Sequence, residues 1–193
     1  MSKYNLEPIS LEKLSTIPIA ERGGKVQIEH FATAHTPGAG FDAWLRRLPA
    51  LLAADQLREL VRVIREARSK GKPVIWGMGG HVVKCGLSPV LLDLMRRGYV
   101  QAFVMNGSTA IHDFEIAIAG CTSEDVEAVL PDGRFGSAEE TGREMNEAIR
   151  NGVAAGLGWG ESLGRHLQSI AVPEFAPHSL LFEAYRAGVP VTV

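Results

Sequence analysis

Glycines and polar residues follow two short apolar runs in the middle of the chain. Residues 77–84 (GMGGHVVK) follow the run 73–76, and residues 106–113 (NGSTAIHD) follow the run 100–105. Glycine at a strand end lets backbone N–H groups approach a phosphate, and a following helix N-terminus favours the phosphate charge. The two segments therefore predict a nucleotide or dinucleotide site.

Histidines occur in both segments. His81 lies in the first, and His112 with Asp113 in the second. A histidine near a carboxylate can move a proton or hold a ribose or an amine; the alternative is a polar residue at a helix start. The HDxE pattern at 112–115 does not put three metal ligands on one helix face, so no metal site is expected.

The dinucleotide fingerprint GxGxxG is incomplete. Gly77 and Gly79 begin the pattern, but Val82 stands at the third glycine position. The second apolar run ends in Asn106, where an acidic residue would hold a ribose hydroxyl. A tight strand-to-helix turn without a ligand is therefore the alternative interpretation.

Apolar runs and amphipathic stretches alternate along the chain. This alternation predicts parallel strands joined by right-handed crossovers, hence an α/β fold. Residues 1–40 are expected to form an extension, with a short strand at 25–29 and a loop at 36–40, and residues 41–193 an α/β domain. Its helices are predicted around 57–70, 88–97, 109–119, 137–149 and 177–187, and its strands at 73–76, 100–105 and 189–193, with a loop at 156–160.

Composition narrows the classes of function. The chain has 193 residues, 46% of them hydrophobic, and a net charge of -2. We expect a globular cytoplasmic protein without a membrane span or secretory signal. Residues 1–97 carry 15 Lys and Arg against 9 Asp and Glu, whereas residues 98–193 carry 5 against 13. A nucleic-acid-binding protein would show an overall basic excess, so we expect no nucleic-acid partner.

Residues 104–113 (VMNGSTAIHD) resemble the strand-end motif of the deoxyhypusine synthase family, of the type VTTGANIVHD. Residues 94–100 (LMRRGYV), 132–135 (DGRF) and 187–191 (AGVPV) also resemble that family, and the likeness extends over residues 57–193. The resemblance implies a Rossmann-like parallel sheet flanked by helices. It also implies a tetramer with active sites between subunits.

The resemblance further implies NAD-dependent transfer of an aminobutyl group from spermidine to a lysine of a translation initiation factor. The positions expected to bind NAD are Gly79, Gly80, His81, Lys84, Asn106, Gly107, Ser108, His112 and Asp113.

The sequence departs from the family in its lysines. The family forms a substrate imine on a lysine of its C-terminal part, and no lysine follows Lys84 in this chain. We therefore expect this chain to be the N-terminal part of a longer protein, inactive alone and without catalytic residues of its own. The alternatives are a divergent enzyme like homospermidine synthase and a non-catalytic nucleotide-binding module of the same fold.

Overall fold

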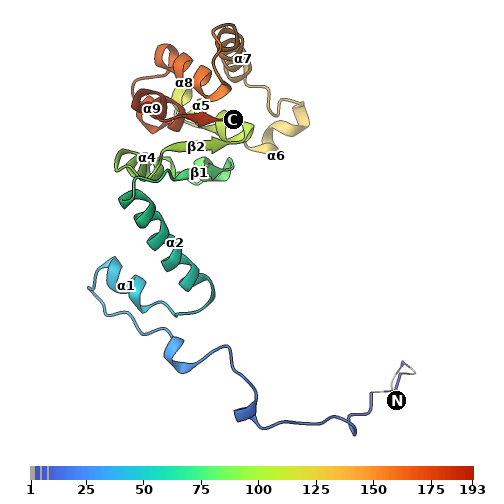
Figure 1. Ribbon diagram of the computed structural model, residues 1–193. Helices are drawn as coiled ribbons and strands as arrows, with labels where there is room; N and C mark the ends of the chain where they lie inside the picture. Colours follow the sequence, from blue (N-terminus) through green and yellow to red (C-terminus); the bar gives the residue numbers. More distant parts are fainter. Residues whose placement is uncertain (1–2, 5, 8) are drawn as a thin grey trace. The chain divides into compact units, whose positions relative to one another are not determined.

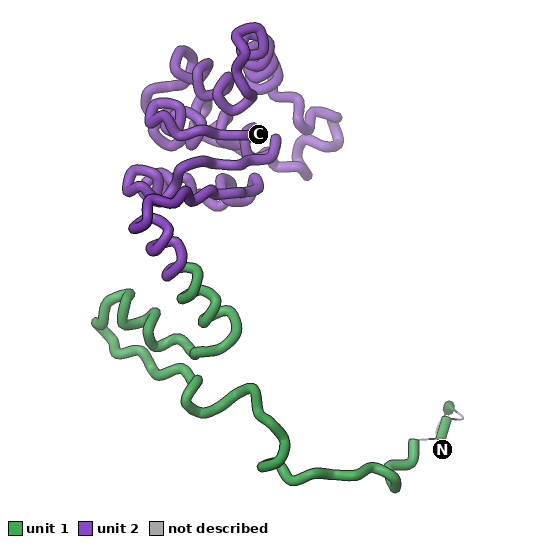
Figure 2. Tube along the Cα trace, in the orientation of Figure 1, with its two compact units in different colours: residues 1–60 green, residues 61–193 purple. Residues whose placement is uncertain are grey.

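The computed structural model describes residues 3–4, 6–7 and 9–193, which form two compact units, 1–60 and 61–193 (Figure 2). The functional boundary expected after residue 40 stays a prediction. The elements, labelled in Figure 1, are α1 (Phe41–Arg47), α2 (Leu52–Ser69), β1 (Ile75–Met78), α3 (His81–Lys84), α4 (Ser88–Arg96), β2 (Ala102–Met105), α5 (Gly107–Ala119), α6 (Val126–Val129), α7 (Glu139–Ala154), α8 (Trp159–Ile170), α9 (Leu180–Ala187) and β3 (Val191–Thr192), with short 3-10 turns at Ile19–Glu21, Ile28–His30, Leu130–Asp132 and Ala176–His178.

Hydrogen bonds hold residues 30–58 together around the end of α1. The guanidinium of Arg58 donates to the carbonyl oxygens of Leu48 and Pro49, at 3.1 and 2.6 Å. These oxygens follow the last turn of α1, where backbone acceptors lack intrahelical partners. The strand expected at 25–29 is wrong, since a 3-10 turn lies at Ile28–His30. A single extended segment with no neighbouring strand leaves its backbone hydrogen-bonding groups unpaired. Here the carbonyl oxygen of His30 accepts a hydrogen bond from the N–H of Ala50 at 2.9 Å.

Residues 61–193 form a mixed α/β unit with a three-stranded parallel sheet in the order β1-β2-β3. Burial alternates along the strands, as strand geometry requires. Phe103 and Met105 are buried among the helices, whereas Ile75 and Val104 are 62% and 43% exposed. The helices thus cover one face of the sheet through a core that includes Phe103, Phe114, Leu163, Leu167 and Leu180.

Helix α8 was not expected, because residues 156–160 look like a glycine-rich loop. Two of the glycines in this region permit close packing instead. A Cβ on Gly160 would lie 2.0 Å from the carbonyl oxygen of Val191, and a Cβ on Gly164 would lie 2.7 Å from the Cβ of Tyr185. The absence of side chains at these positions lets α8 pack closely against β3 and α9, which lie beside it in Figure 1.

A buried carboxylate fastens α9 to α5. Asp113 of α5 is fully buried, and its oxygens accept from the N–H groups of Leu180 and Leu181 at 2.7 and 2.8 Å and from the hydroxyl of Ser179 at 2.7 Å. Ser179 is itself the N-cap of α9 and accepts from the N–H of Phe182. The first turn of α9 therefore finds its hydrogen-bond acceptors on another helix and on its own cap.

The Asp113→Asn variant tests this arrangement through pH. Burial raises the pKa of the Asp113 carboxyl from 3.8 to about 6, against the lowering effect of its hydrogen bonds. Between these values the folded chain holds a proton that the unfolded chain has lost. The free energy of unfolding should therefore fall as the pH rises from about 4 to about 6, by up to about 3 kcal/mol.

Urea denaturation at a series of pH values measures this slope. Asp113→Asn should lack it, whereas Asp93→Asn, at an exposed ion pair with Arg97, should retain it. An equal slope in wild type and Asp113→Asn would contradict the assignment.

Candidate functional site

The two segments singled out in the sequence meet at one edge of the sheet. Strands β1 and β2 are parallel, with Met78 beside Met105, so the segments that follow the two strands leave the sheet at the same edge. A Cβ on Gly79 would lie 3.8 Å from Nδ2 of Asn106, and one on Gly80 would lie 2.4 Å from Oγ of Ser108. The prediction that the segments lie side by side is confirmed.

Asn106 alone connects β2 to α5. Helix α5 begins at Gly107, two residues earlier than predicted, because the Asn106 side chain caps it by accepting from the N–H of Thr109 at 3.0 Å. The Thr109 hydroxyl lies 2.8 Å from Oδ1 of Asn106 and 3.3 Å from the carbonyl oxygen of Met78. This capping sets the start of α5 at the end of β1, and Gly77 and Met78 belong to that strand rather than to a loop.

The first-turn N–H groups of α5 are partly free. Thr109 donates to the Asn106 side chain and Ala110 to the Asn106 carbonyl. The N–H groups of Gly107 and Ser108 precede any intrahelical acceptor. Within the described part of the chain they have no hydrogen-bond partner, so they can donate to an anion at the positive end of a 13-residue helix.

Gly80 is required by packing against α5. It is buried with φ −56° and ψ −25°, which any residue can adopt. A Cβ there would meet Ser108 Oγ at 2.4 Å and Cδ2 of His112 at 3.1 Å. The glycine therefore permits contact between the start of α3 and α5, and its role is to place Ser108 and His112.

A cavity of about 680 Å³, which we call the loop cavity, opens beside these segments. Three of the predicted residues line it, namely Lys84, Ser108 and His112. His81 and Asn106 are exposed but do not line it. Residues that sequence reasoning missed complete the wall, above all the aromatic side chains of Phe135 and Trp159, together with Ile111, Glu115, Ser123, Glu124, Val126, Gly136, Ala138, Thr141, Gly142, Met145, Asn146 and Ile149.

The loop cavity fits the chemistry of a dinucleotide. Lys84 and the N–H groups at the start of α5 suit a pyrophosphate. Trp159 and Phe135, 38% and 53% exposed, offer ring faces for a base. A Cβ on Gly107 would lie 3.7 Å from Cη2 of Trp159, so the start of α5 lies beside the Trp159 ring.

His112 belongs to a hydrogen-bonded group that connects α5 to the segment after it. Its Nδ1 lies 2.7 Å from Oγ1 of Thr122, and that hydroxyl donates to Oε2 of Glu115. Because the single hydroxyl proton of Thr122 goes to the carboxylate, Nδ1 of His112 must carry the proton in their own hydrogen bond. Nε2 of a neutral His112 is then left as an acceptor.

Asp113 does not take part in the candidate site. It was expected to bind a cofactor, but its carboxylate is fully buried and accepts from Ser179, Leu180 and Leu181. On a helix, the adjacent residue faces about 100° away from His112, which turns Asp113 toward the core. Its role is the attachment of α9 described above.

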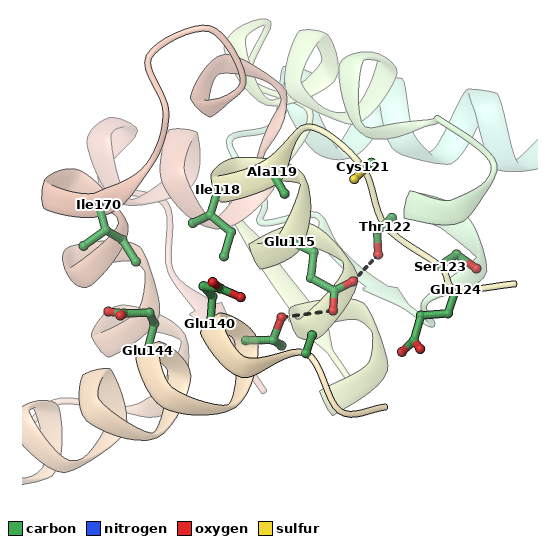
Figure 3. A pocket seen from close by; sticks show the side chains of 12 residues that line it. Glu115, Ile118, Ala119, Cys121, Thr122, Ser123, Glu124, Glu140, Glu144 and Ile170 are labelled. Carbon is green, nitrogen blue, oxygen red and sulfur yellow. Dashed lines mark hydrogen bonds between the residues drawn. The ribbon is translucent and has the colours of Figure 1, made fainter. Parts of the chain in front are cut away.

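A second cavity, of about 780 Å³, shares Glu115 with the loop cavity and is named the acidic cavity (Figure 3). Glu115, Glu124, Glu140 and Glu144 line it together with apolar residues that include Ile118 and Ile170. Glu144 lies 3.0 Å from Nε2 of His166, and the hydrogen bonds from His166 and Arg143 lower the pKa of the Glu144 carboxyl. This lining favours a ligand with positive charge and an aliphatic body.

Two further properties of the described residues bear on the class of site. No cluster of three or more His, Cys, Asp and Glu side chains there could hold a metal ion, and no helix there is long and apolar enough to cross a membrane.

No protein-family model matches the chain. A curated relative, the probable deoxyhypusine synthase 1 of Methanosarcina mazei, is 26% identical over 157 residues, which are 72% of this chain and 47% of the relative. The chain therefore spans about half the length of that protein. The match supports a distant relationship to the family that the 104–113 motif resembles.

Solved structures give distant matches. The apo form of ArgZ, an arginine dihydrolase from the ornithine-ammonia cycle in cyanobacteria, aligns with a TM-score of 0.45 at 20% identity, over 70% of this chain and 17% of its own. A putative LOR/SDH protein from Methanococcus maripaludis S2 aligns with a TM-score of 0.44 at 17% identity, over 89% of this chain and 44% of its own.

The contact between Gly80 and α5 predicts a contrast between neighbouring glycines. Gly80→Ala should lower the free energy of unfolding by about 1–3 kcal/mol, because the new Cβ overlaps Ser108. Gly79→Ala has ordinary contact at 3.8 Å and should be neutral or stabilising by up to about 1 kcal/mol. Urea denaturation of both variants checks this, and equal stabilities would show that the contact is loose.

Proposed function

We propose that this chain supplies the NAD-binding part of a transferase like deoxyhypusine synthase. In this proposal the sheet and helices belong to a Rossmann-like fold, and the enzyme moves an aminobutyl group from spermidine to an amine acceptor. The observation that carries the proposal is the meeting of the β1 and β2 ends beside the loop cavity, which Lys84, Ser108 and His112 help to line. The distant relative named for that activity supports it.

The pyrophosphate, one ring and one ribose of a dinucleotide each have a counterpart among the chain's own residues. The N–H groups of Gly107 and Ser108 and the ammonium of Lys84 hold the pyrophosphate, and Trp159 stacks with a ring. His112, oriented by Thr122, accepts a ribose hydroxyl through Nε2. When bound, NAD supplies a hydride acceptor.

The reactive lysine of such an enzyme must come from outside residues 1–193. Covalent amine catalysis needs a lysine whose amine is deprotonated by burial or neighbouring charge. Lys84 is exposed, and no lysine follows it. A polyamine donor, a protein acceptor such as a translation initiation factor, and a homo-oligomeric assembly are parts of the same proposal, as is action in the cytoplasm.

The same absence of a later lysine favours a second candidate, a non-catalytic module that binds a nucleotide in the loop cavity. An enzyme acting on another polyamine, as homospermidine synthase does, would use the same cavity. Because fold does not determine function, binding and chemistry must be tested separately.

NAD binding should depend on the start of α5. Calorimetric titration of the wild-type chain with NAD should show one site, and Gly107→Val should abolish it because the side chain blocks approach to the backbone. Lys84→Gln should weaken binding about tenfold through loss of a phosphate contact.

Lys72→Gln provides the matched control, because Lys72 is also exposed but lies outside the loop cavity. It should leave the affinity unchanged. Equal affinity in wild type and a folded Gly107→Val variant would place the ligand elsewhere.

The chain alone should form no covalent intermediate with the donor. Incubation with NAD and labelled spermidine, followed by borohydride reduction to trap imines, should leave the protein unlabelled because all of its lysines are exposed and none has the buried environment that activates a lysine amine. Mass spectrometry detects the product. A stoichiometric adduct on Lys84 would instead make this chain a complete enzyme.

A further inference from the structure

One carboxylate fastens both ends of the segment that connects α5 to α7. Near the start of the segment, the Thr122 hydroxyl donates to Oε2 of Glu115. After its end, the Thr141 hydroxyl donates to Oε1 of the same residue at 3.2 Å. Figure 3 shows these two bonds leaving the Glu115 carboxylate in different directions. The side chain of Glu115 is only 20% exposed.

The residues between these ends are fastened only to one another. Within residues 123–137 of the described chain, the hydrogen bonds and ion pairs are local, such as Gly136 N–H to Glu124 at 2.9 Å and Arg134 to Asp132 at 2.7 Å. Apolar side chains there stay open to solvent, with Leu130 60% and Phe135 53% exposed. Such a segment opens at low cost once its ends are released.

The backbone beside Thr122 has the geometry of a hinge. Ser123 has φ 70°, a left-handed conformation that a non-glycine residue adopts at a cost. This strain persists while the neighbouring Thr122 is held by Glu115 and His112. Release of Thr122 would let Ser123 return to an ordinary conformation, which favours opening.

The segment is also one wall of the loop cavity. Its residues Ser123, Glu124, Val126, Phe135 and Gly136 line that cavity together with Lys84 and Ser108. Opening of the segment would therefore expose whatever the cavity holds.

We propose that residues 122–141 form a strap that closes the loop cavity, and that Glu115 is the positioning residue that clasps both ends of the strap. The identity of the ligand, a dinucleotide, rests on the proposed function; the clasp itself does not. Glu115 acts through Thr122 and Thr141, and through Thr122 it also orients His112.

Hydrogen–deuterium exchange of the full chain, followed by mass spectrometry, tests the clasp without a ligand. Glu115→Ala should accelerate exchange of amides in residues 122–138 about tenfold, because two charge-assisted hydrogen bonds are lost. Thr141→Val keeps the side-chain volume and should accelerate the same amides by a smaller factor. In the double variant Thr141→Val should add nothing, since its partner is already gone.

Glu147→Ala is the matched control, because Glu147 is an exposed carboxylate of α7 that lines neither cavity. It should leave exchange in the strap unchanged. Amides of α8 and α9 should remain protected in every variant, which separates opening of the strap from unfolding. If Glu115→Ala does not fold, Thr141→Val alone decides the question.

The rate of NAD dissociation, measured by stopped-flow chase with excess unlabelled nucleotide after loading with a fluorescent NAD analogue, tests closure of the cavity. Glu115→Ala and Thr141→Val should both accelerate release, and Glu115→Gln, which retains one acceptor oxygen, should restore part of the slow rate. A structural role far from the ligand would leave this rate unchanged.

The outcomes separate the two proposals. Unchanged exchange in the strap, with a protected core, overturns the clasp. Faster exchange with an unchanged dissociation rate overturns closure of the cavity by the strap. Failure of wild type to bind the nucleotide overturns the proposed function, while the exchange experiment still decides the clasp.

Discussion

The parallel register of β1 and β2 is the constraint on which the candidate site depends. With Met78 beside Met105, the segments after both strands emerge at one edge of the sheet, and a helix follows each strand closely. After β2, Asn106 alone leads into α5 and caps that helix. After β1, Gly80 leads into α3, and its lack of a side chain leaves room for Ser108 of α5. A shift of either strand by one residue would separate these partners and exchange the buried and exposed faces of the strand.

The helices after α5 depend on contacts that lie far apart in the sequence. Asp113 supplies the acceptors for the start of α9, and Gly160 and Gly164 bring α8 against β3 and α9. These contacts place Trp159, the first residue of α8, at the loop cavity. Residues that follow α5 therefore complete the lining of the loop cavity.

Local patterns predicted the three strands of the sheet and most of the longer helices, because apolar runs followed by glycine mark strand ends in a parallel sheet; the strand they predicted at 25–29 is wrong. They also predicted that residues 77–84 and 106–113 lie close together, because segments that follow neighbouring parallel strands emerge at the same edge of the sheet. They failed where a residue's role depends on a distant partner. Gly160 resembles a loop glycine until Val191 is placed beside it, and Asp113 resembles a ligand until α9 is seen to begin against it. The helix expected from residue 137 begins at Glu139, without a side-chain cap.

In the proposed function, the start of α5 and the adjoining glycine segment form a nucleotide site. The most direct measurement is a titration of the 15N-labelled chain, of 20.8 kDa, with NAD, followed by amide and indole N–H resonances. We predict saturable shifts concentrated at Gly79, Gly107, Ser108 and the indole of Trp159, with small shifts in α9. The absence of shifts at millimolar NAD, or shifts confined to residues outside the loop cavity, would contradict the account.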